Sequence, residues 1–352
     1  MNRPFALALS CFILAPLAGL SFAPAAEPAN EILNHLTSKD GLPGAGEIAL
    51  PKPSMADGLD RAGQRAAIAA IADANHPPEA LERKSVVAPL VLKIGGDDPA
   101  EKQRSLRRVD IWFIAYGKLD TIADESFWKS VRNSGSDRED QELSTTKTAI
   151  FSADELRARN ITDPDDERHL TADLTLFNRV RVSATMQAKQ TRSSESIVLA
   201  AMLDPRFADD HEFPNRWWPL TRDGAGHQQQ GQPHPYRTAG WYCKVTQLQE
   251  PAGAIFVEYH VLFDEPYGWF DGANLLRSKL PLVVQDGVRK FRRHLQQGSG
   301  VGGRGSGKAT GQLSVVSRQL FASDSPTPGK SPASNGQRAT DIVTVAAAHR
   351  PA

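Results

Sequence analysis

The chain has 352 residues, of which 40% are hydrophobic and 23% are charged, an ordinary balance for a globular protein. Its formal net charge is zero, so the composition carries no sign of a nucleic-acid partner. Two cysteines are too few for a framework of several disulfides. We therefore expect a globular protein that binds no nucleic acid and does not depend on disulfides.

Residues 1–25 are typical of a secretory signal peptide. Arg3 precedes a short apolar run, and the small residues 23–25 form an A-x-A cleavage site. We expect cleavage after Ala25 or Ala26, which leaves a secreted or periplasmic protein with no transmembrane segment in the mature chain. The alternative is an uncleaved N-terminal anchor, for which the apolar run is short.

Cleavage would remove Cys11 and leave Cys243 as the single cysteine. Cys243 lies in the strand-like run GWYCKVTQL, where no neighbour would obviously lower the pKa of its thiol. We expect a small buried side chain rather than a nucleophile.

After the signal peptide, residues 26–53 are rich in Pro, Gly and Ala and are expected to form an irregular lead-in. A single α+β domain is expected to follow at 54–296. It begins with an Ala-rich helix at 54–76, for which Ser54 is the expected N-cap, and a pair of prolines ends that helix.

A change in the apolar period to two predicts strands from residue 85 onward. The first two are expected at 85–94 and 107–119. A helix is predicted at 123–133, and the polar residues 133–148 are expected to form a mobile loop.

Two antiparallel hairpins are predicted in the second half of the domain. Residues 177–190 alternate between an apolar and a polar face, and the following run at 193–204 is apolar on both faces. A polar loop at 221–238 separates this hairpin from a second one, whose strands are expected at 240–249 and 254–264.

The last expected element is an amphipathic helix at 272–297. Pro281 is expected either to kink this helix or to lie at its start. Basic residues crowd its C-terminal end, where cations suit the helix dipole. Its apolar stripe consists of Leu276, Leu280, Val284, Val288, Phe291 and Leu295.

Residues 297–352 are rich in Gly, Ser and Pro and are expected to form a largely disordered tail. The stretch GGRGSGKAT at 302–310 resembles a phosphate-binding loop. However, Ala309 stands where such a loop has Ser or Thr, and no strand precedes the stretch. We therefore interpret it as the boundary between domain and tail and expect no nucleotide cofactor.

Glu258 and His260 are the best polar pair in the chain. Residues two apart in a strand share a face and lie about 6.5–7 Å apart. Three interpretations remain open, namely an acid/base pair, two ligands of a metal, or a hydrogen-bonded polar network. No third ligand at a suitable spacing is present, so we predict no metal site. Trp269 follows in an aromatic loop that either rims a pocket or fills the core.

A second polar and aromatic cluster lies in the stretch DDHEFPNRWWPL at 209–220. Its acidic residues could bind calcium, and an exposed Trp217 or Trp218 could stack on a sugar. Packing of the two tryptophans in the core explains the pattern equally well. Common hydrolase motifs such as H-E-x-x-H and G-x-S-x-G are absent, so we assign no catalytic residue.

The predicted order is an early helix, about six antiparallel strands and a long C-terminal helix, an α+β fold. This order resembles the helix-grip architecture of START and Bet v1-like domains over roughly residues 55–296. The resemblance implies a sheet that curves around the last helix and encloses an apolar cavity.

Three hypotheses about function follow. The favoured one is a non-catalytic module that binds an apolar or lipid-like ligand through Glu258, Tyr259, His260 and Trp269, without a cofactor. The first alternative is an enzyme that uses Glu258 and His260 as acid and base. The second is a structural or interaction protein of the cell envelope, whose basic helix end and tail contact an envelope component.

Overall fold

The computed structural model describes residues 29–298, except 40, 43, 46–47, 97–103, 134–142, 163–165, 267–268 and 271–274. The described residues belong to a compact unit that spans Met1–Gly303. The predicted signal peptide, the stretch at 302–310 and nearly all of the predicted tail lie outside the described residues.

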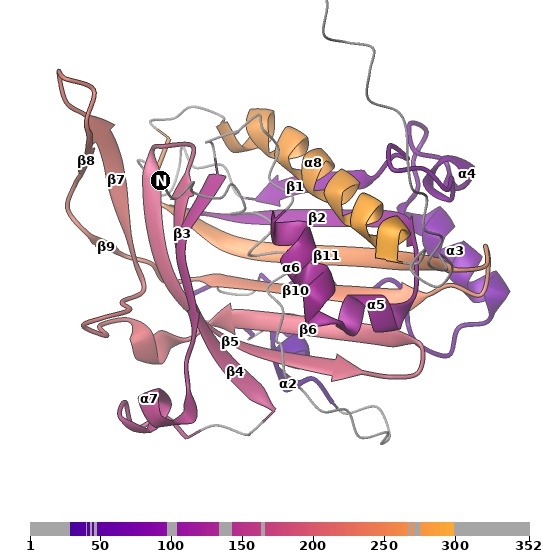
Figure 1. The fold of residues 1–352 in the computed structure, drawn as a ribbon, viewed down its shortest axis with the longest axis horizontal. Helices are drawn as coiled ribbons and strands as arrows, with labels where there is room; N and C mark the ends of the chain where they lie inside the picture. Colours follow the sequence, from indigo (N-terminus) through magenta and orange to yellow (C-terminus); the bar gives the residue numbers. More distant parts are fainter. Residues whose placement is uncertain are drawn as a thin grey trace, which may run out of the picture. The chain divides into compact units, whose positions relative to one another are not determined.

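The centre of the fold is an antiparallel sheet (Figure 1). Its main path runs in the order β1-β2-β11-β10-β6-β5-β4-β3. Outside this path, β7 pairs with β5, and β8 and β9 each pair with β7. The antiparallel α+β prediction is confirmed, but about six strands was too few, because the described residues form eleven. The bounds are β1 Val91–Gly96, β2 Arg104–Tyr116, β3 Leu143–Ile150, β4 Glu167–Leu176, β5 Val180–Arg192, β6 Ser196–Leu203, β7 Arg216–Arg222, β8 Gln228–Gln230, β9 His234–Pro235, β10 Ala239–Gln247 and β11 Ala254–Pro266.

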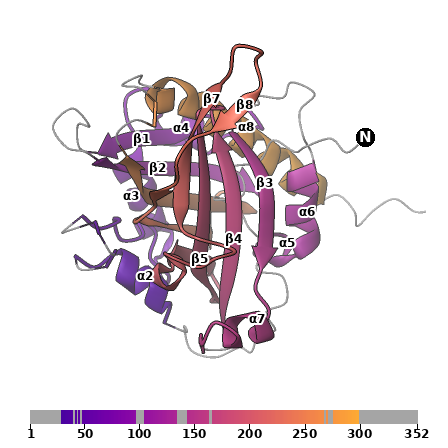
Figure 2. The same cartoon turned by 90° about the vertical axis from the view of Figure 1, so that its left-hand side faces the viewer.

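Both predicted hairpins are present, β5 with β6 and β10 with β11. β11 lies between β2 and β10, so the last strand that the structure describes joins the two halves of the sheet. Figure 2 shows β3, β4 and β5 running up the view while β1 and β2 run across it, so the sheet twists strongly along its path.

The helix α8 (Leu275–Gly298) lies across one face of the sheet, with α5 (Leu119–Ala123) and α6 (Glu125–Asn133) beside it (Figure 1). The predicted stripe is confirmed, because all six of its side chains are buried in the largest apolar cluster. Pro281 lies inside the helix, which begins at Leu275. Each fully buried large side chain stabilises the contact by roughly 1.5–3 kcal/mol.

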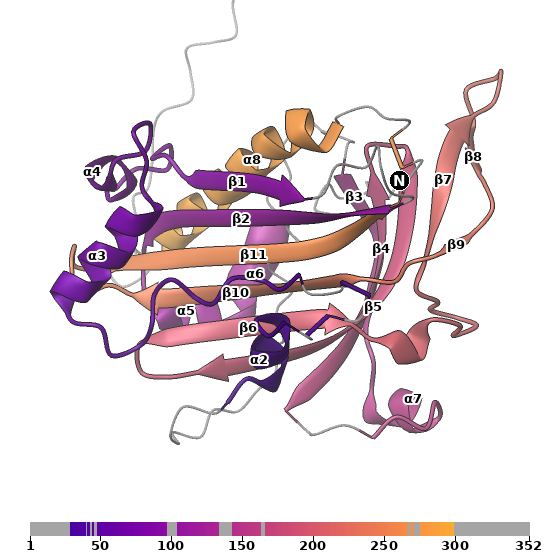
Figure 3. The same cartoon turned by 180° about the vertical axis from the view of Figure 1, so that it is seen from behind.

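The N-terminal part of the chain covers the opposite face (Figure 3). It contains α2 (Glu31–Leu36), α3 (Arg61–Ile71) and α4 (Pro78–Leu81). The helix predicted at 54–76 is shorter than expected and is capped by Asp60. The physical reason is that Gly58 has φ 79°, outside the helical region, so a continuous helix cannot run through this position.

The strand predicted at 85–94 also needs correction, because only Val91–Gly96 pairs with β2. The guanidinium of Arg292 donates hydrogen bonds to the carbonyls of Ala88 and Pro89, which holds the preceding segment as a turn. Arg292 is therefore buried, and only part of the predicted basic helix end faces solvent.

Part of the polar region expected to be a mobile loop at 133–148 is strand β3, and β4 beside it was not expected. The predicted loop at 221–238 likewise contains β8 and β9. The short helices α7 (Ala153–Arg157) and η1 (Pro205–Phe207) complete this end of the fold. A small apolar cluster of Phe151, Ile161 and Phe207 packs there.

Candidate functional site

An apolar cavity of about 80 Å³ lies between the sheet and the N-terminal half of α8. Strands β2, β4, β5, β10 and β11 contribute its walls, and Leu276 and Leu280 of α8 close it. The remaining lining side chains are Val109, Ile111, Leu174, Leu176, Val182, Tyr236, Ala239, Tyr259, Val261, Phe263 and Trp269.

Strand alternation explains why this cavity is apolar. On β11, Tyr259, Val261 and Phe263 face α8, whereas the side chains between them face the opposite side of the sheet. Between Ile255 and Phe263, the face of β11 that meets the helix carries no charged residue, and Glu265 at the end of the strand is paired with Arg107.

A second, smaller void of about 30 Å³ lies further along α8. Ile111 and Tyr259 line both spaces, so these two side chains form the partition between them. Cys243 lines the second void, and burial raises the pKa of its thiol to about 12. The expectation of a buried, unreactive thiol at this position agrees with that environment.

Among the described side chains that line the first cavity, only the aromatic ones carry polar groups. Trp269 is buried and lies parallel to the ring of Tyr236, with ring centroids 5.9 Å apart. Its Nε1–H has no hydrogen-bond partner among the described residues. Burial raises the pKa of Tyr236, with Asp264 adding to the effect, so its phenol is neutral at physiological pH.

Of the four residues predicted to bind a ligand, Tyr259 and Trp269 line this cavity, whereas Glu258 and His260 lie on the opposite face of the sheet. Glu258 and His260 are fully buried there. The Glu258 carboxylate accepts hydrogen bonds from the backbone N–H groups of Ser54, at 2.7 Å, and Met55, at 3.2 Å. Glu258 thus fixes the N-terminal segment to the sheet.

His260 belongs to the same buried network. Its Nδ1 lies 2.8 Å from Oδ1 of Asp110, and its Nε2 lies 3.7 Å from Oε2 of Glu258. Burial opposes protonation of the ring, but the hydrogen bond to Asp110 and the nearby negative charge of Glu258 outweigh it and raise the pKa of His260. The imidazolium is therefore favoured between two carboxylates, which suits a polar network that fastens chain segments.

Asp57 forms a second attachment of the N-terminal segment. Its carboxylate lies 2.7 Å from Nζ of Lys244 and accepts hydrogen bonds from the hydroxyls of Ser193 and Ser196. We call residues 48–60 the N-terminal strap, since they cross the sheet between α2 and α3 (Figure 3). The strap was missed in the sequence because no local pattern connects Asp57 and Ser54 to strands that lie far along the chain.

Comparison with known proteins does not assign the chain to a family. No family model matches it, and no curated protein matches it. The solved structures that match it include two human proteins. The lipid transfer and protein localization domain of StarD13 (DLC2) has 8% sequence identity and a TM-score of 0.31, covering 58% of this chain and 90% of that chain. STARD10 has 8% identity and a TM-score of 0.29, covering 70% of this chain and 87% of that chain.

Two kinds of feature are absent among the described residues, a metal-binding cluster and a membrane-spanning helix. No group of three or more His, Cys, Asp and Glu side chains is arranged there to hold a metal ion. Within the same part of the chain, no helix has the length and the apolar character needed to cross a bilayer.

Proposed function

We propose that the protein binds an apolar or lipid-like molecule, without catalysis, in the cavity between the sheet and α8. The observation that carries this proposal is a cavity whose wall is apolar except for its aromatic side chains, with the unpartnered Nε1–H of Trp269 in the wall. A ligand with a hydrocarbon body and one hydrogen-bond acceptor would fill the space and satisfy this donor.

The size of the cavity limits how such a ligand enters. Pockets for drug-sized ligands typically enclose about 300–1,000 Å³, whereas this cavity encloses about 80 Å³. Binding a long-chain molecule would therefore require α8 to move away from the sheet. Displacement of Tyr259 would join the two voids into one longer space.

The proposed place of action is outside the cytosol, in the periplasm or in a secreted form. This part of the proposal is supported by the signal-peptide pattern of residues 1–25.

The test is a substitution that fills the cavity. Val261→Phe adds a ring to the wall, and we expect it to weaken binding of a dansyl-labelled fatty acid by about tenfold or more. The measurement is a fluorescence titration of the purified mature protein. The matched control is Val87→Phe, because the side chain of Val87 is 70% exposed and lies outside this cavity.

Overpacking a core also costs stability, so thermal unfolding of each variant is recorded beside the titration. If Val261→Phe remains folded and binds the probe as tightly as Val87→Phe does, the cavity is not the binding site. Mass spectrometry of small molecules extracted from the unmodified protein should show an apolar compound that is depleted in Val261→Phe.

A further inference from the structure

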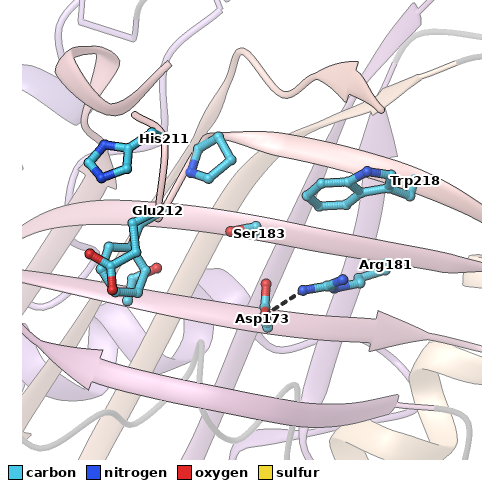
Figure 4. A pocket seen from close by; sticks show the side chains of 9 residues that line it. Asp173, Arg181, Ser183, His211, Glu212 and Trp218 are labelled. Carbon is cyan, nitrogen blue, oxygen red and sulfur yellow. Dashed lines mark hydrogen bonds and ion pairs between the residues drawn. The ribbon is translucent and has the colours of Figure 1, made fainter. Parts of the chain in front are cut away.

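A polar pocket of about 220 Å³ lies on the face of the sheet that points away from α8 (Figure 4). It is formed by β4, β5, β7 and the loop at 209–214. Strand alternation separates it from the apolar cavity. Leu174 of β4 and Val182 of β5 face that cavity, whereas the neighbouring Asp173 and Ser183 face this pocket.

The floor of the pocket carries two hydroxyls and a carboxylate. Asp173 of β4 is the direct cross-strand partner of Ser183 of β5, and Thr171 lies two residues away on β4. Thr171 and Ser183 are largely buried, yet their hydroxyls form no hydrogen bond with another described residue. Two polar groups at the bottom of a pocket are thus available to a ligand.

One wall is the indole of Trp218, which lies next to Arg181 in the pairing of β7 with β5. The guanidinium carbon of Arg181 is 4.9 Å from the centre of the Trp218 ring. The same guanidinium donates to Asp173 at 2.8 Å and to Gln230 at 2.9 Å, so its orientation is fixed before any ligand arrives.

The opposite wall is the loop that carries His211 and Glu212 (Figure 4). Asp210 holds this loop by accepting hydrogen bonds from the backbone N–H groups of Glu212 and Phe213. Arg159 in turn binds Asp210 and Glu212, at 2.9 and 3.1 Å. Both walls are therefore held in place by hydrogen bonds and ion pairs within the protein, which reduces the ordering cost of binding.

The charged side chains around the pocket already have partners of opposite charge. Asp173 is paired with Arg181, and Arg159 is shared by Glu212 and Asp210. A charged ligand would gain little from such paired groups, whereas hydroxyl groups can donate to a carboxylate and accept from a guanidinium at the same time. The half-buried Trp218 offers an apolar ring surface beside these groups.

We propose that this pocket binds a neutral polyol of about the size of one sugar ring. The C–H face of the ring would lie against Trp218, and its hydroxyls would bind Asp173, Arg181 and Ser183. The volume is below that of a drug-sized pocket, which is about 300–1,000 Å³, and favours a single ring over an extended chain. Neighbouring tryptophans in the sequence thus have separate roles, since Trp217 is buried in the core.

The test is a titration of the mature protein with the methyl glycosides of glucose, galactose, mannose and N-acetylglucosamine. Binding is measured by isothermal titration calorimetry and by saturation-transfer NMR. We expect saturable binding of at least one glycoside. Trp218→Ala should weaken it about tenfold, and Ser183→Ala should weaken it several-fold. The matched control is Thr221→Ala, an exposed position on the same strand β7, which should bind as the unmodified protein does.

Thermal unfolding of each variant is recorded by circular dichroism to check that it is folded. If Trp218→Ala does not fold, Asp173→Asn is used in its place. The proposal is wrong if none of the four glycosides binds up to its solubility limit, or if the pocket variants bind as tightly as Thr221→Ala. Binding of inorganic phosphate or of free amino acids in place of every glycoside would also overturn it. Fatty-acid binding should be unchanged in Trp218→Ala, which separates this test from that of the apolar cavity.

Discussion

Two buried cationic side chains in this protein are held by polar interactions with acceptors of distant segments. Arg292 is fully buried, and burial lowers its pKa to about 10, so it remains a cation at physiological pH. The guanidinium of Arg292 donates hydrogen bonds to backbone carbonyls of β2 and of the turn before β1. His260 is stabilised as a cation by two carboxylates. Each of these groups connects segments that are distant in the sequence.

Asp204 gives a prediction about acid stability. Burial opposes its ionisation, but hydrogen bonds from His169 and Arg206 outweigh burial and lower its pKa to about 2. An unfolded Asp has a pKa near 3.9, so the stabilisation is complete above that pH and is lost as pH falls toward about 2. We expect Asp204→Asn to lower the free energy of unfolding by about 2 kcal/mol at pH 7, measured by urea unfolding.

The difference between Asp204→Asn and the unmodified protein should shrink between about pH 4 and pH 2. The control is Asp209→Asn, because the Asp209 side chain is 90% exposed and its ion pair with Arg216 contributes little. An equal loss of stability at pH 7 and pH 2 would contradict the assignment of this effect to ionised Asp204.

Among the elements, those with one clear apolar pattern were predictable. β5, β6, β10, β11 and α8 each show such a pattern, and each is present. β4 also alternates, with Leu170, Ala172, Leu174 and Leu176 on one face, and this signal could have identified it. β3 and β8 are rich in polar residues, and their pairing depends on neighbours that local sequence does not reveal.

The candidate site was half predictable for the same reason. The alternation of β11 correctly put Glu258 and His260 on one face and Tyr259 on the other. The side of the sheet that meets α8 was also open to inference, because an apolar helical stripe packs against the face without charges. The strap that covers Glu258 could not be inferred, since its contacts join residues about 200 positions apart.

The helix α8 gives a prediction at its interior glycine. A Cβ placed on Gly287 meets no atom within 4 Å, because the residue borders the second void. Gly287→Ala should raise the free energy of unfolding by about 0.4–1 kcal/mol, since alanine restricts the unfolded chain and favours helix. Urea unfolding monitored by circular dichroism measures the change.

The matched control is Gly117→Ala. A Cβ on Gly117 would overlap with the side chain of Leu295, so this variant should lose about 1–3 kcal/mol of stability. If Gly287→Ala is destabilised as strongly as Gly117→Ala, the space beside α8 is not open as the structure shows it.

At the scale of the whole molecule, the two faces of the sheet differ in polarity. The face toward α8 is apolar and contains the cavity, whereas the opposite face carries the buried polar network, the strap and the polar pocket. The two proposed ligand sites therefore lie on opposite sides of the same strands.

The proposed export of the molecule predicts a change in its mass. Produced with its complete N-terminus in a Gram-negative host, the protein should be recovered from the periplasm without residues 1–25 or 1–26. Intact-mass spectrometry measures this directly. Substitution of Ala23 and Ala25 by Asp should block cleavage. Recovery of the protein without these substitutions from the cytosol in unprocessed form would contradict the proposal.

The position of β11 has a consequence for how the chain acquires its structure. During synthesis, β1 with β2 and the strands from β3 to β10 are made before the strand that joins them. Until residues 254–266 emerge, the two halves have no shared partner, and Ser54 lacks the carboxylate that receives its N–H. Folding to completion must therefore wait for nearly the whole domain, and forming such distant contacts is slow. The proposed export would then take place before β11 has joined the two halves of the sheet.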